Sequence, residues 1–343
     1  MSVYTNLTAA EVSDFLNQFE LGEYSSHQGI SAGVENTNFF VETVIKTDTK
    51  DEIHRYVLTL FEQHNAEQVK GFIQIGRHLA EQAVPVPGPI ADQEGIYLHE
   101  LKAKPAILCP CLPGSHPSAL TAEHCHQIGA ALARFHLAGK GLDHLEENDK
   151  GLHWWPEIGR ELMHLSMQTE LLTPEQQSIL MDEIEYQESN TELWYQLPRG
   201  LIHGDLFHDN VLFESYLNTD GTSQDQLRAI LDIYNACQDA WLFDLAIVAN
   251  DWCADAQGQW KEGLLPALFK GYQSERELTE QEQGAWGMCL RAAALRFWLS
   301  RLVTQQHQTD LISNDPMAAL ITTIKDPMEY FLKLMRHRET NYF

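Results

Sequence analysis

Basic residues are scarce in this chain of 343 residues, which carries 23 Lys and Arg against 49 Asp and Glu and therefore a formal net charge of −26. A surface this acidic repels nucleic acid and anionic lipid, so neither is an expected partner. No apolar run approaches the ~18 residues of a membrane-spanning helix. The first twenty residues include Glu11, Asp14 and Glu20, which a signal peptide would not carry. These absences predict a cytoplasmic protein.

Paired cysteines and the usual phosphate-binding glycines are also missing. The six cysteines form no C-x-x-C pair, so we expect free thiols in a reducing compartment. Neither G-x-G-x-x-G nor G-x-x-x-x-G-K-[ST] occurs in the chain, which removes two common signatures of nucleotide binding. The apolar content of 44% is ordinary for a globular protein. A chain of this length is expected to form one two-lobed protein or two domains.

The most informative stretch of the sequence is the polar segment 203–210, which lies between two apolar runs that we interpret as buried strands. Within it, His203, Asp205 and Asn210 have the spacing H-x-D-x-x-x-x-N of kinase catalytic loops. In such loops the Asp accepts the proton of the acceptor hydroxyl and the Asn binds Mg²⁺. The segment therefore predicts phosphoryl transfer, with Asp205 as the base.

A second carboxylate strengthens this interpretation. Asp232 ends the apolar run 229–231, and the turn residues 218–221 predict a hairpin that brings Asp232 beside Asn210. Mg²⁺ prefers oxygen ligands and usually takes one or two carboxylates together with substrate phosphates. Asn210 and Asp232 are therefore the expected metal ligands. The alternative is a chance match to the motif, in which His203 is a core histidine and Asp205 caps a turn; the position of Asp232 argues against it.

The N-terminal third of the chain has the pattern of a small sheet with helices. Residue periodicity predicts helices at 8–20 and 64–82 and strands on either side of a polar turn within 30–41, at 56–62, at 95–100 and at 105–109. In the polar turn, Gly33 allows the backbone to approach a ligand. We expect Gly33, Asn36 and Asn38 to contact the nucleotide phosphates, because backbone N–H groups in such turns cradle anions. An ordinary hairpin turn is the alternative.

The proline-rich segment 109–114 marks a change of pattern, after which the chain is mainly helical. Helices are predicted at 121–138, 154–170, 174–197, 262–276, 279–306 and 316–338, and Asp244 is expected to open a further one. We therefore expect an α+β protein of two lobes. Residues 1–110 would form an N-terminal nucleotide-binding lobe with a small antiparallel sheet, and residues 111–343 a mainly helical lobe for catalysis and substrate binding.

These motifs together resemble the aminoglycoside phosphotransferase and choline kinase superfamily, whose fold is protein-kinase-like. Further stretches resemble the bacterial homoserine kinases of that superfamily, over about residues 25–335. They are G-V-E-N-T-N at 33–38, Y-V-L-T-L-F-E at 56–62, D-I-Y-N-A-C at 232–237, N-D-W-C at 250–253 and R-A-A-A-L-R-F at 291–297. The combination is specific, although each stretch alone is short.

The resemblance implies ATP- and Mg²⁺-dependent phosphorylation of the side-chain hydroxyl of L-homoserine, a step of threonine biosynthesis. It implies that Asp205 is the base, that His203 belongs to the same catalytic loop and braces it, and that Asn210 and Asp232 bind the metal. Homoserine also carries a carboxylate, for which Arg296 is the candidate partner. The alternative for Arg296 is a salt bridge to a surface carboxylate.

Two questions stay open at this point. Thr59 stands where many kinases carry a lysine that contacts the nucleotide phosphates, so the residues that replace this lysine are unassigned. The acceptor is the second question, because an acidic surface also suits a cationic substrate such as an amino alcohol or an aminoglycoside. A nucleotide-binding regulator without catalysis is the alternative outside the enzymes.

Overall fold

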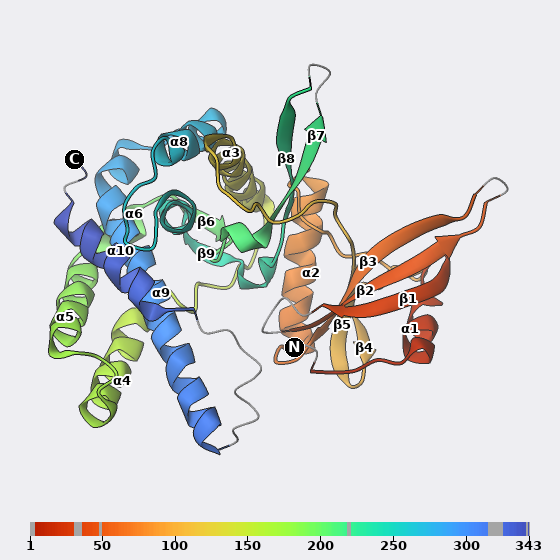
Figure 1. The fold of residues 1–343 in the computed structure, drawn as a ribbon, viewed down its shortest axis with the longest axis horizontal. Helices are drawn as coiled ribbons and strands as arrows, with labels where there is room; N and C mark the ends of the chain where they lie inside the picture. Colours follow the sequence, from red (N-terminus) through yellow and green to blue (C-terminus); the bar gives the residue numbers. More distant parts are fainter. Residues whose placement is uncertain are drawn as a thin grey trace. The chain divides into compact units, whose positions relative to one another are not determined.

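The computed structural model describes residues 4–30, 36–47, 50–217, 221–314, 325–340 and 342, with the backbone alone for 308–314. Two compact units adjoin in sequence between Pro113 and Gly114. The first is an antiparallel sheet with helices, and the second is mainly helical (Figure 1). In the described part of the chain, no helix is both long enough and apolar enough to cross a membrane.

The N-terminal unit is built on a five-stranded antiparallel sheet with the strand order β1-β2-β3-β5-β4. The strands are β1 (Glu23–Ile30), β2 (Asn36–Ile45), β3 (Glu52–Phe61), β4 (His99–Leu101) and β5 (Lys104–Pro110). Helix α1 (Ala9–Leu16) packs on the face of the sheet that carries Leu58 and Leu60. Helix α2 (Ala66–Glu81) packs on the other face, where the rings of Phe61 and Phe72 are 6.0 Å apart.

Local capping explains where these two helices begin. Thr8 and Glu11 form a reciprocal capping box at α1, and Asn65 and Gln68 form another at α2. The predicted helix at 8–20 is too long, because α1 ends at Leu16. The chain must then turn into β1 through Gly22, whose φ of +91° and whose closeness to β2 both require a glycine. A Cβ at this position would lie 2.6 Å from the carbonyl oxygen of Val44.

The C-terminal unit contains eight α-helices in its described residues and two pairs of antiparallel strands. The strand pairs are β6 (Arg199–Ile202) with β9 (Cys237–Ala240), and β7 (Val211–Leu217) with β8 (Ser223–Ile230). The helices are α3 (Ala122–Ala138), α4 (Trp154–Thr169), α5 (Pro174–Ser189), α6 (Thr191–Gln196), α7 (Trp241–Val248), α8 (Leu264–Glu275), α9 (Glu280–Asn314) and α10 (Pro327–Glu339).

Helices α3 and α8 lie side by side (Figure 1) and approach so closely that glycine is needed at the contact. A Cβ at Gly271 of α8 would lie 1.9 Å from the carbonyl oxygen of His126. A Cβ at Gly129 of α3 would lie 2.3 Å from the carbonyl oxygen of Leu268. Neither position can accept even a methyl group without a shift of backbone.

Two of the predicted helices of this unit need correction. The helix predicted at 174–197 is interrupted at Asn190, which has non-helical dihedrals and whose side-chain Nδ2 donates to the carbonyl oxygen of Tyr186. The helix predicted at 316–338 begins only at Pro327, because Asp326 accepts a hydrogen bond from the backbone N–H of Met328 and thereby caps it. The part of that prediction up to residue 324 lies outside the described residues.

Candidate active site

The segment 203–210 connects β6 to β7, and the strand pairs hold both of its ends. Ile202 pairs with Cys237 of β9, and Val211 pairs with Ile230 of β8. The backbone N–H of Leu231 donates to the carbonyl oxygen of Asn210 at 2.8 Å, so Asp232 follows directly after a contact with the end of the loop. The hairpin therefore leads back to Asn210 as predicted, although most of its turn, at 218–220, lies outside the described residues.

His203 is fully buried and connects the loop to the residue that precedes Asp232. Its Nδ1 accepts a hydrogen bond from the backbone N–H of Asp205 at 3.2 Å, and its Nε2 donates to the carbonyl oxygen of Leu231 at 2.8 Å. The two bonds require a neutral ring with its proton on Nε2. His203 thus ties the backbone of Asp205 to the strand that precedes Asp232, and its part in the site is to position these residues.

Asp244, in the first turn of α7, is buried and holds the backbone of the loop 203–210 through hydrogen bonds. The backbone N–H groups of His203 and Gly204 donate to its two carboxylate oxygens at 2.7 and 2.9 Å, and His136 Nε2 donates at 3.0 Å. Burial acts to raise the pKa of Asp244, but the hydrogen bond and charge of His136 outweigh it and the net pKa is lowered. Asp244 is therefore a charged anchor that holds the backbone of the loop in place.

Gly204 can occupy its place only because it has no side chain. Its φ is +77°, in the left-handed region, and a Cβ would lie 3.2 Å from the carbonyl oxygen of Asn235. Many kinases have an arginine here. The tight turn at Gly204 brings the next residue, Asp205, out of the strand and toward solvent.

The side chain of Asp205 is partly exposed to solvent, but most of its surroundings are buried. Its side chain is 26% exposed, and Arg296 Nη1 lies 3.9 Å from Asp205 Oδ1. Burial raises the pKa of Asp205, while the positive charge of Arg296 opposes that shift. A carboxylate that is reachable and whose pKa is raised toward neutrality is suited to accept a proton from a hydroxyl group.

Arg296 lies on α9 with a side chain that is only 9% exposed, and its guanidinium carbon is 3.8 Å from the ring centroid of Phe297. Its ion pair is with Asp205 of the predicted site. Its distance of 3.9 Å from Asp205 exceeds hydrogen-bond length, so the guanidinium donors are not engaged by that carboxylate. A buried, planar donor group of this kind suits the carboxylate of a substrate.

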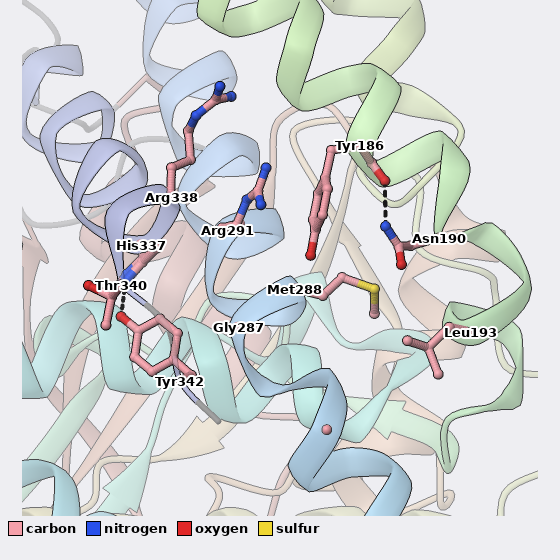
Figure 2. A pocket seen from close by; sticks show the side chains of 11 residues that line it. Tyr186, Asn190, Leu193, Gly287, Met288, Arg291, His337, Arg338, Thr340 and Tyr342 are labelled. Atoms are coloured by element: carbon pink, nitrogen blue, oxygen red, sulfur yellow. Dashed lines mark hydrogen bonds between the residues drawn. The ribbon is translucent and has the colours of Figure 1, made fainter.

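Two other arginines of the same unit have a different surrounding (Figure 2). Arg291 and Arg338 line a cavity of about 250 Å³ together with residues of α5, α9 and α10. Both contact the fully buried carboxylate of Glu183, at 2.6 and 3.2 Å. Arg338 also pairs with Asp182 at 3.4 Å. These ion pairs connect three helices, which leaves Arg296 as the arginine beside the predicted base.

Asn210 and Asp232 are the residues predicted to bind a divalent metal ion. Asn210 Nδ2 donates to the carbonyl oxygen of Asp205 at 2.8 Å, so its amide nitrogen is fixed and the predicted ligand atom is its side-chain oxygen. Asp232 has a φ of +56°, an uncommon conformation for a residue with a side chain. Such backbone strain is concentrated at functional sites. One amide oxygen and one carboxylate fit an ion such as Mg²⁺, whose remaining ligands come from phosphates and water.

The residues predicted to contact the nucleotide belong to the N-terminal unit. Gly33 lies outside the described residues. Asn38 of β2 is opposite Thr59 of β3 and accepts a hydrogen bond from its hydroxyl at 2.7 Å. Asn36 is 6% exposed, and its Oδ1 has no hydrogen-bond partner in the described part of the chain. This oxygen is a hydrogen-bond acceptor and does not itself bind a phosphate oxygen, so the phosphate contact of Asn36 stays a prediction.

One carboxylate that supports the catalytic loop had no predicted role. Asp251 lies in the π-helical turn Ala249–Cys253, and its Oδ2 accepts from the backbone N–H of His208 at 2.8 Å and from the ring Nδ1 at 2.7 Å. The hydrogen bond raises the pKa of His208. The stretch N-D-W-C at 250–253 was a sequence signal for this residue, but nothing in it revealed which loop Asp251 contacts.

A family model matches residues 26–278 of this chain, and its description is the phosphotransferase enzyme family. The chain belongs to this family. Among curated relatives, the homoserine kinase of Methylobacillus flagellatus is 37% identical over 337 residues, which cover 98% of this chain and 95% of the relative. The homoserine kinase of Cupriavidus taiwanensis is 38% identical over 305 residues, which cover 88% of this chain and 87% of the relative.

Solved structures of other kinases share the fold of this phosphotransferase. The amicoumacin kinase hAmiN, in complex with AMP-PNP, Ca²⁺ and Ami, has a TM-score of 0.62 at 14% identity and covers 97% of this chain and 92% of its own. The choline kinase of Cryptosporidium parvum has a TM-score of 0.60 at 14% identity and covers 97% and 96%. The predicted α+β, two-lobed, protein-kinase-like fold is thereby confirmed.

The residues of the predicted site lie on both sides of residue 278, where the match to the family model ends. Asp205, Asn210 and Asp232 lie within the residues 26–278 that the family model matches. Arg296 lies beyond them, on a helix that the alignment with the homoserine kinase of Methylobacillus flagellatus covers, because that alignment takes in 98% of the chain. The residues predicted to act in phosphoryl transfer thus lie in the part that the family model matches, and the candidate carboxylate partner lies in the part that the alignment with the homoserine kinase adds.

Proposed function

We propose that this phosphotransferase is a homoserine kinase, which transfers the terminal phosphoryl group of ATP to the side-chain hydroxyl of L-homoserine and forms O-phospho-L-homoserine, a step of threonine biosynthesis. The observation that carries the proposal is the contact of Asp205 with the buried Arg296 at 3.9 Å, in a chain whose relatives are homoserine kinases. A base beside a carboxylate-binding group suits an acceptor that has both a hydroxyl and a carboxylate. We place the reaction in the cytoplasm, where ATP is available.

The chain's own residues have defined parts in this reaction. The acceptor hydroxyl oxygen attacks the γ-phosphorus of ATP, the bond from that phosphorus to the β–γ bridging oxygen breaks, ADP leaves, and Asp205 takes the hydroxyl proton. His203 and Asp244 hold the loop so that Asp205 stays in place. A divalent ion, which we propose to be Mg²⁺ held by Asn210 and Asp232, would neutralise the phosphate charge when bound.

In this proposal, each of the two units binds one of the two substrates. The N-terminal lobe, residues 1–110, binds the nucleotide, with Gly33, Asn36 and Asn38 as phosphate contacts. The C-terminal lobe, residues 111–343, supplies catalysis and the acceptor site. Thr59 cannot replace the missing lysine as a cation, and its hydroxyl already donates to Asn38, so backbone N–H groups carry more of the phosphate binding than in kinases that have the lysine.

A panel of acceptors tests the proposal by steady-state kinetics of ADP release. L-Homoserine should give the highest kcat/KM. Homoserinol should have a much higher KM because it lacks the carboxylate, and L-serine should react slowly because its hydroxyl falls one carbon short of Asp205. The net charge of −26 favours a kinase for a cationic acceptor as the second candidate. Choline or kanamycin as the best acceptor would establish that alternative and reject homoserine.

A further inference from the structure

The catalytic loop carries a second carboxylate, that of Asp209, which the proposed reaction does not use. On one side of it, His208 donates to Asp251 from both its backbone N–H and its ring. On the other side, Asn210 donates from its side chain to the carbonyl oxygen of Asp205. The backbone on either side of Asp209 is therefore fixed, while the Asp209 side chain is 48% exposed.

The partner of this carboxylate is the ammonium group of Lys325, which precedes helix α10. The nitrogen Nζ of Lys325 lies 2.9 Å from Asp209 Oδ2 and 5.0 Å from the ring centroid of Phe207. A carboxylate and an aromatic face together form a favourable environment for a cationic amine. The lysine ammonium group thus marks a place on the catalytic loop where an ammonium group is bound.

Phe207 is a fixed part of this environment. It is 4% exposed, and its ring centroid lies 4.6 Å from that of Phe297 and 6.2 Å from that of Tyr330. Its backbone N–H donates to the carbonyl oxygen of Asp205 at 2.8 Å. A ligand that contacts the face of this ring in place of Lys325 meets a surface that is already ordered, which lowers the entropic cost of binding.

Lys325 itself is fixed at its backbone and exposed at its side chain. The next residue, Asp326, caps α10, and its carbonyl oxygen accepts a hydrogen bond from Arg301 at 2.7 Å. The Lys325 side chain, in contrast, is 52% exposed. An ion pair in which both side chains are about half exposed is weak. A ligand that has an ammonium group of its own can therefore displace the lysine from Asp209.

This ammonium environment adjoins the groups that act on the acceptor in the proposed function. Phe297, which packs on Phe207, also contacts Arg296, whose guanidinium carbon is 3.8 Å from the ring centroid of Phe297. Arg296 in turn lies 3.9 Å from Asp205. Two neighbouring rings thus connect the cation proposed for the acceptor carboxylate with the surroundings of Asp209, and the base belongs to the same loop as Asp209.

A zwitterionic acceptor needs an anion for its ammonium group as well as a cation for its carboxylate. Asp205 is poorly suited to be that anion, because an ammonium contact would lower its pKa and weaken it as a base. Asp209 accepts no proton in the reaction, and it already binds an ammonium group, that of Lys325.

We propose that Asp209 and the face of Phe207 bind the α-ammonium group of the acceptor, and that Lys325 occupies this place until the acceptor displaces it. This inference rests on the proposed function, because it takes the acceptor to be an amino acid. With the carboxylate at Arg296 and the ammonium group at Asp209, the α-carbon is held at two points, which orients the side-chain hydroxyl for the base. Lys325 lowers the apparent affinity for the acceptor, because it fills the site for part of the time.

Two variants with opposite expected effects test the inference, through the KM for L-homoserine at saturating ATP and Mg²⁺. Lys325→Met removes the internal competitor, so the KM should fall ~2–5-fold, the range that an exposed ion pair spans. Asp209→Asn removes the anion, so the KM should rise by roughly 10-fold or more. In the Asp209→Asn background, Lys325→Met should have no further effect, because without the carboxylate the lysine no longer occupies the site.

4-Hydroxybutyrate separates a lost ammonium contact from general damage, because it has the hydroxyl and the carboxylate of the acceptor but no ammonium group. Its KM, or its inhibition constant against L-homoserine where its turnover is too slow, should not rise in Asp209→Asn. Glu188→Gln is the matched control variant, because it breaks a comparably exposed ion pair, that with Arg160, in the same unit. It should leave the KM for L-homoserine unchanged.

An unchanged or higher KM in Lys325→Met would overturn the inference, because the lysine would then not compete with the acceptor. An unchanged KM in Asp209→Asn would also overturn it, and so would equal losses of affinity for both acceptors, which indicate a structural effect. The proposed function fails separately, if the wild type itself does not phosphorylate L-homoserine.

Discussion

Two opposing influences act on the carboxylate of Asp205. Burial raises its pKa, and the guanidinium of Arg296, 3.9 Å away, lowers it. The net effect is a pKa above that of an ordinary aspartate, which makes Asp205 the stronger base. His203 contributes by geometry, since its ring accepts from the backbone of Asp205 and donates to Leu231.

This balance predicts the pH dependence of the reaction. Asp205 must be ionised to accept a proton, so kcat/KM should fall as the pH drops through its pKa, and burial places this acidic limb above the usual aspartate range. Arg296→Gln removes the charge that lowers the pKa, so the limb should move to higher pH. The measurement is kcat/KM against pH for both proteins. Arg160→Gln, at an exposed arginine of α4, is the control and should leave the limb in place. An unmoved limb in Arg296→Gln would contradict the account.

The metal site gives a second prediction for a single residue. Asp232→Asn keeps the shape of the side chain but removes the one full negative charge of the Asn210–Asp232 pair. We expect the concentration of Mg²⁺ needed for half-maximal rate to rise at least ~10-fold, because the carboxylate provides most of the attraction for the ion. The rate is measured against Mg²⁺ at saturating ATP. The same Mg²⁺ dependence in variant and wild type would remove Asp232 from the site.

Site residues that lie close together in the sequence could be predicted. Site residues that only folding brings together could not. His203, Asp205 and Asn210 share one short loop, so their spacing is preserved in the sequence itself. Asp251 is brought to that loop by the fold, where its carboxylate accepts two hydrogen bonds from His208. Nothing in the stretch around Asp251 indicates this pairing, because hydrogen bonds between distant segments have no sequence motif.

Among the elements, the helices with strong end signals were predicted well. Thr121 caps α3, at the position where the predicted helix 121–138 begins. The interruption between α5 and α6 was missed because Asn190 has no proline or glycine beside it, and the apolar pattern continues through it. The close contact of α3 with α8 depends on Gly129 and Gly271, and a glycine inside a helix carries no sign of what lies opposite.

The contact between α3 and α8 predicts an unusual response to alanine. Alanine normally stabilises a helix relative to glycine, but Gly271→Ala places a Cβ 1.9 Å from the carbonyl oxygen of His126. We expect the melting temperature to fall by roughly 5–10 °C, as overpacking of ~2–4 kcal/mol would cause. Gly284→Ala in α9 is the control, because its Cβ would meet no atom within 4 Å. It should leave the melting temperature unchanged or slightly raise it; equal behaviour of the two variants would refute the steric argument.

At the scale of the whole molecule, the two units follow from the change of pattern at the prolines of 109–114. Alternating strands before this segment form the sheet, and helical periodicity after it forms the second unit. The membership of the phosphotransferase family was predicted from the loop 203–210 together with Asp232, and the family model confirms it. The acceptor could not be derived from the spacing of the loop residues, because Arg296, the proposed partner of its carboxylate, lies on α9 and is distant from the loop in sequence.

The central claim is that this protein transfers the phosphoryl group of ATP to the hydroxyl of L-homoserine with Asp205 as the base. The most direct test is ³¹P NMR of the purified protein with ATP, Mg²⁺ and L-homoserine. We predict a phosphomonoester signal, split by the two protons of the adjacent methylene group and equal in amount to the ADP formed. Asp205→Asn should form the same product ~10²–10⁴-fold more slowly. Inorganic phosphate in place of the ester, or an undiminished rate in Asp205→Asn, would contradict the account.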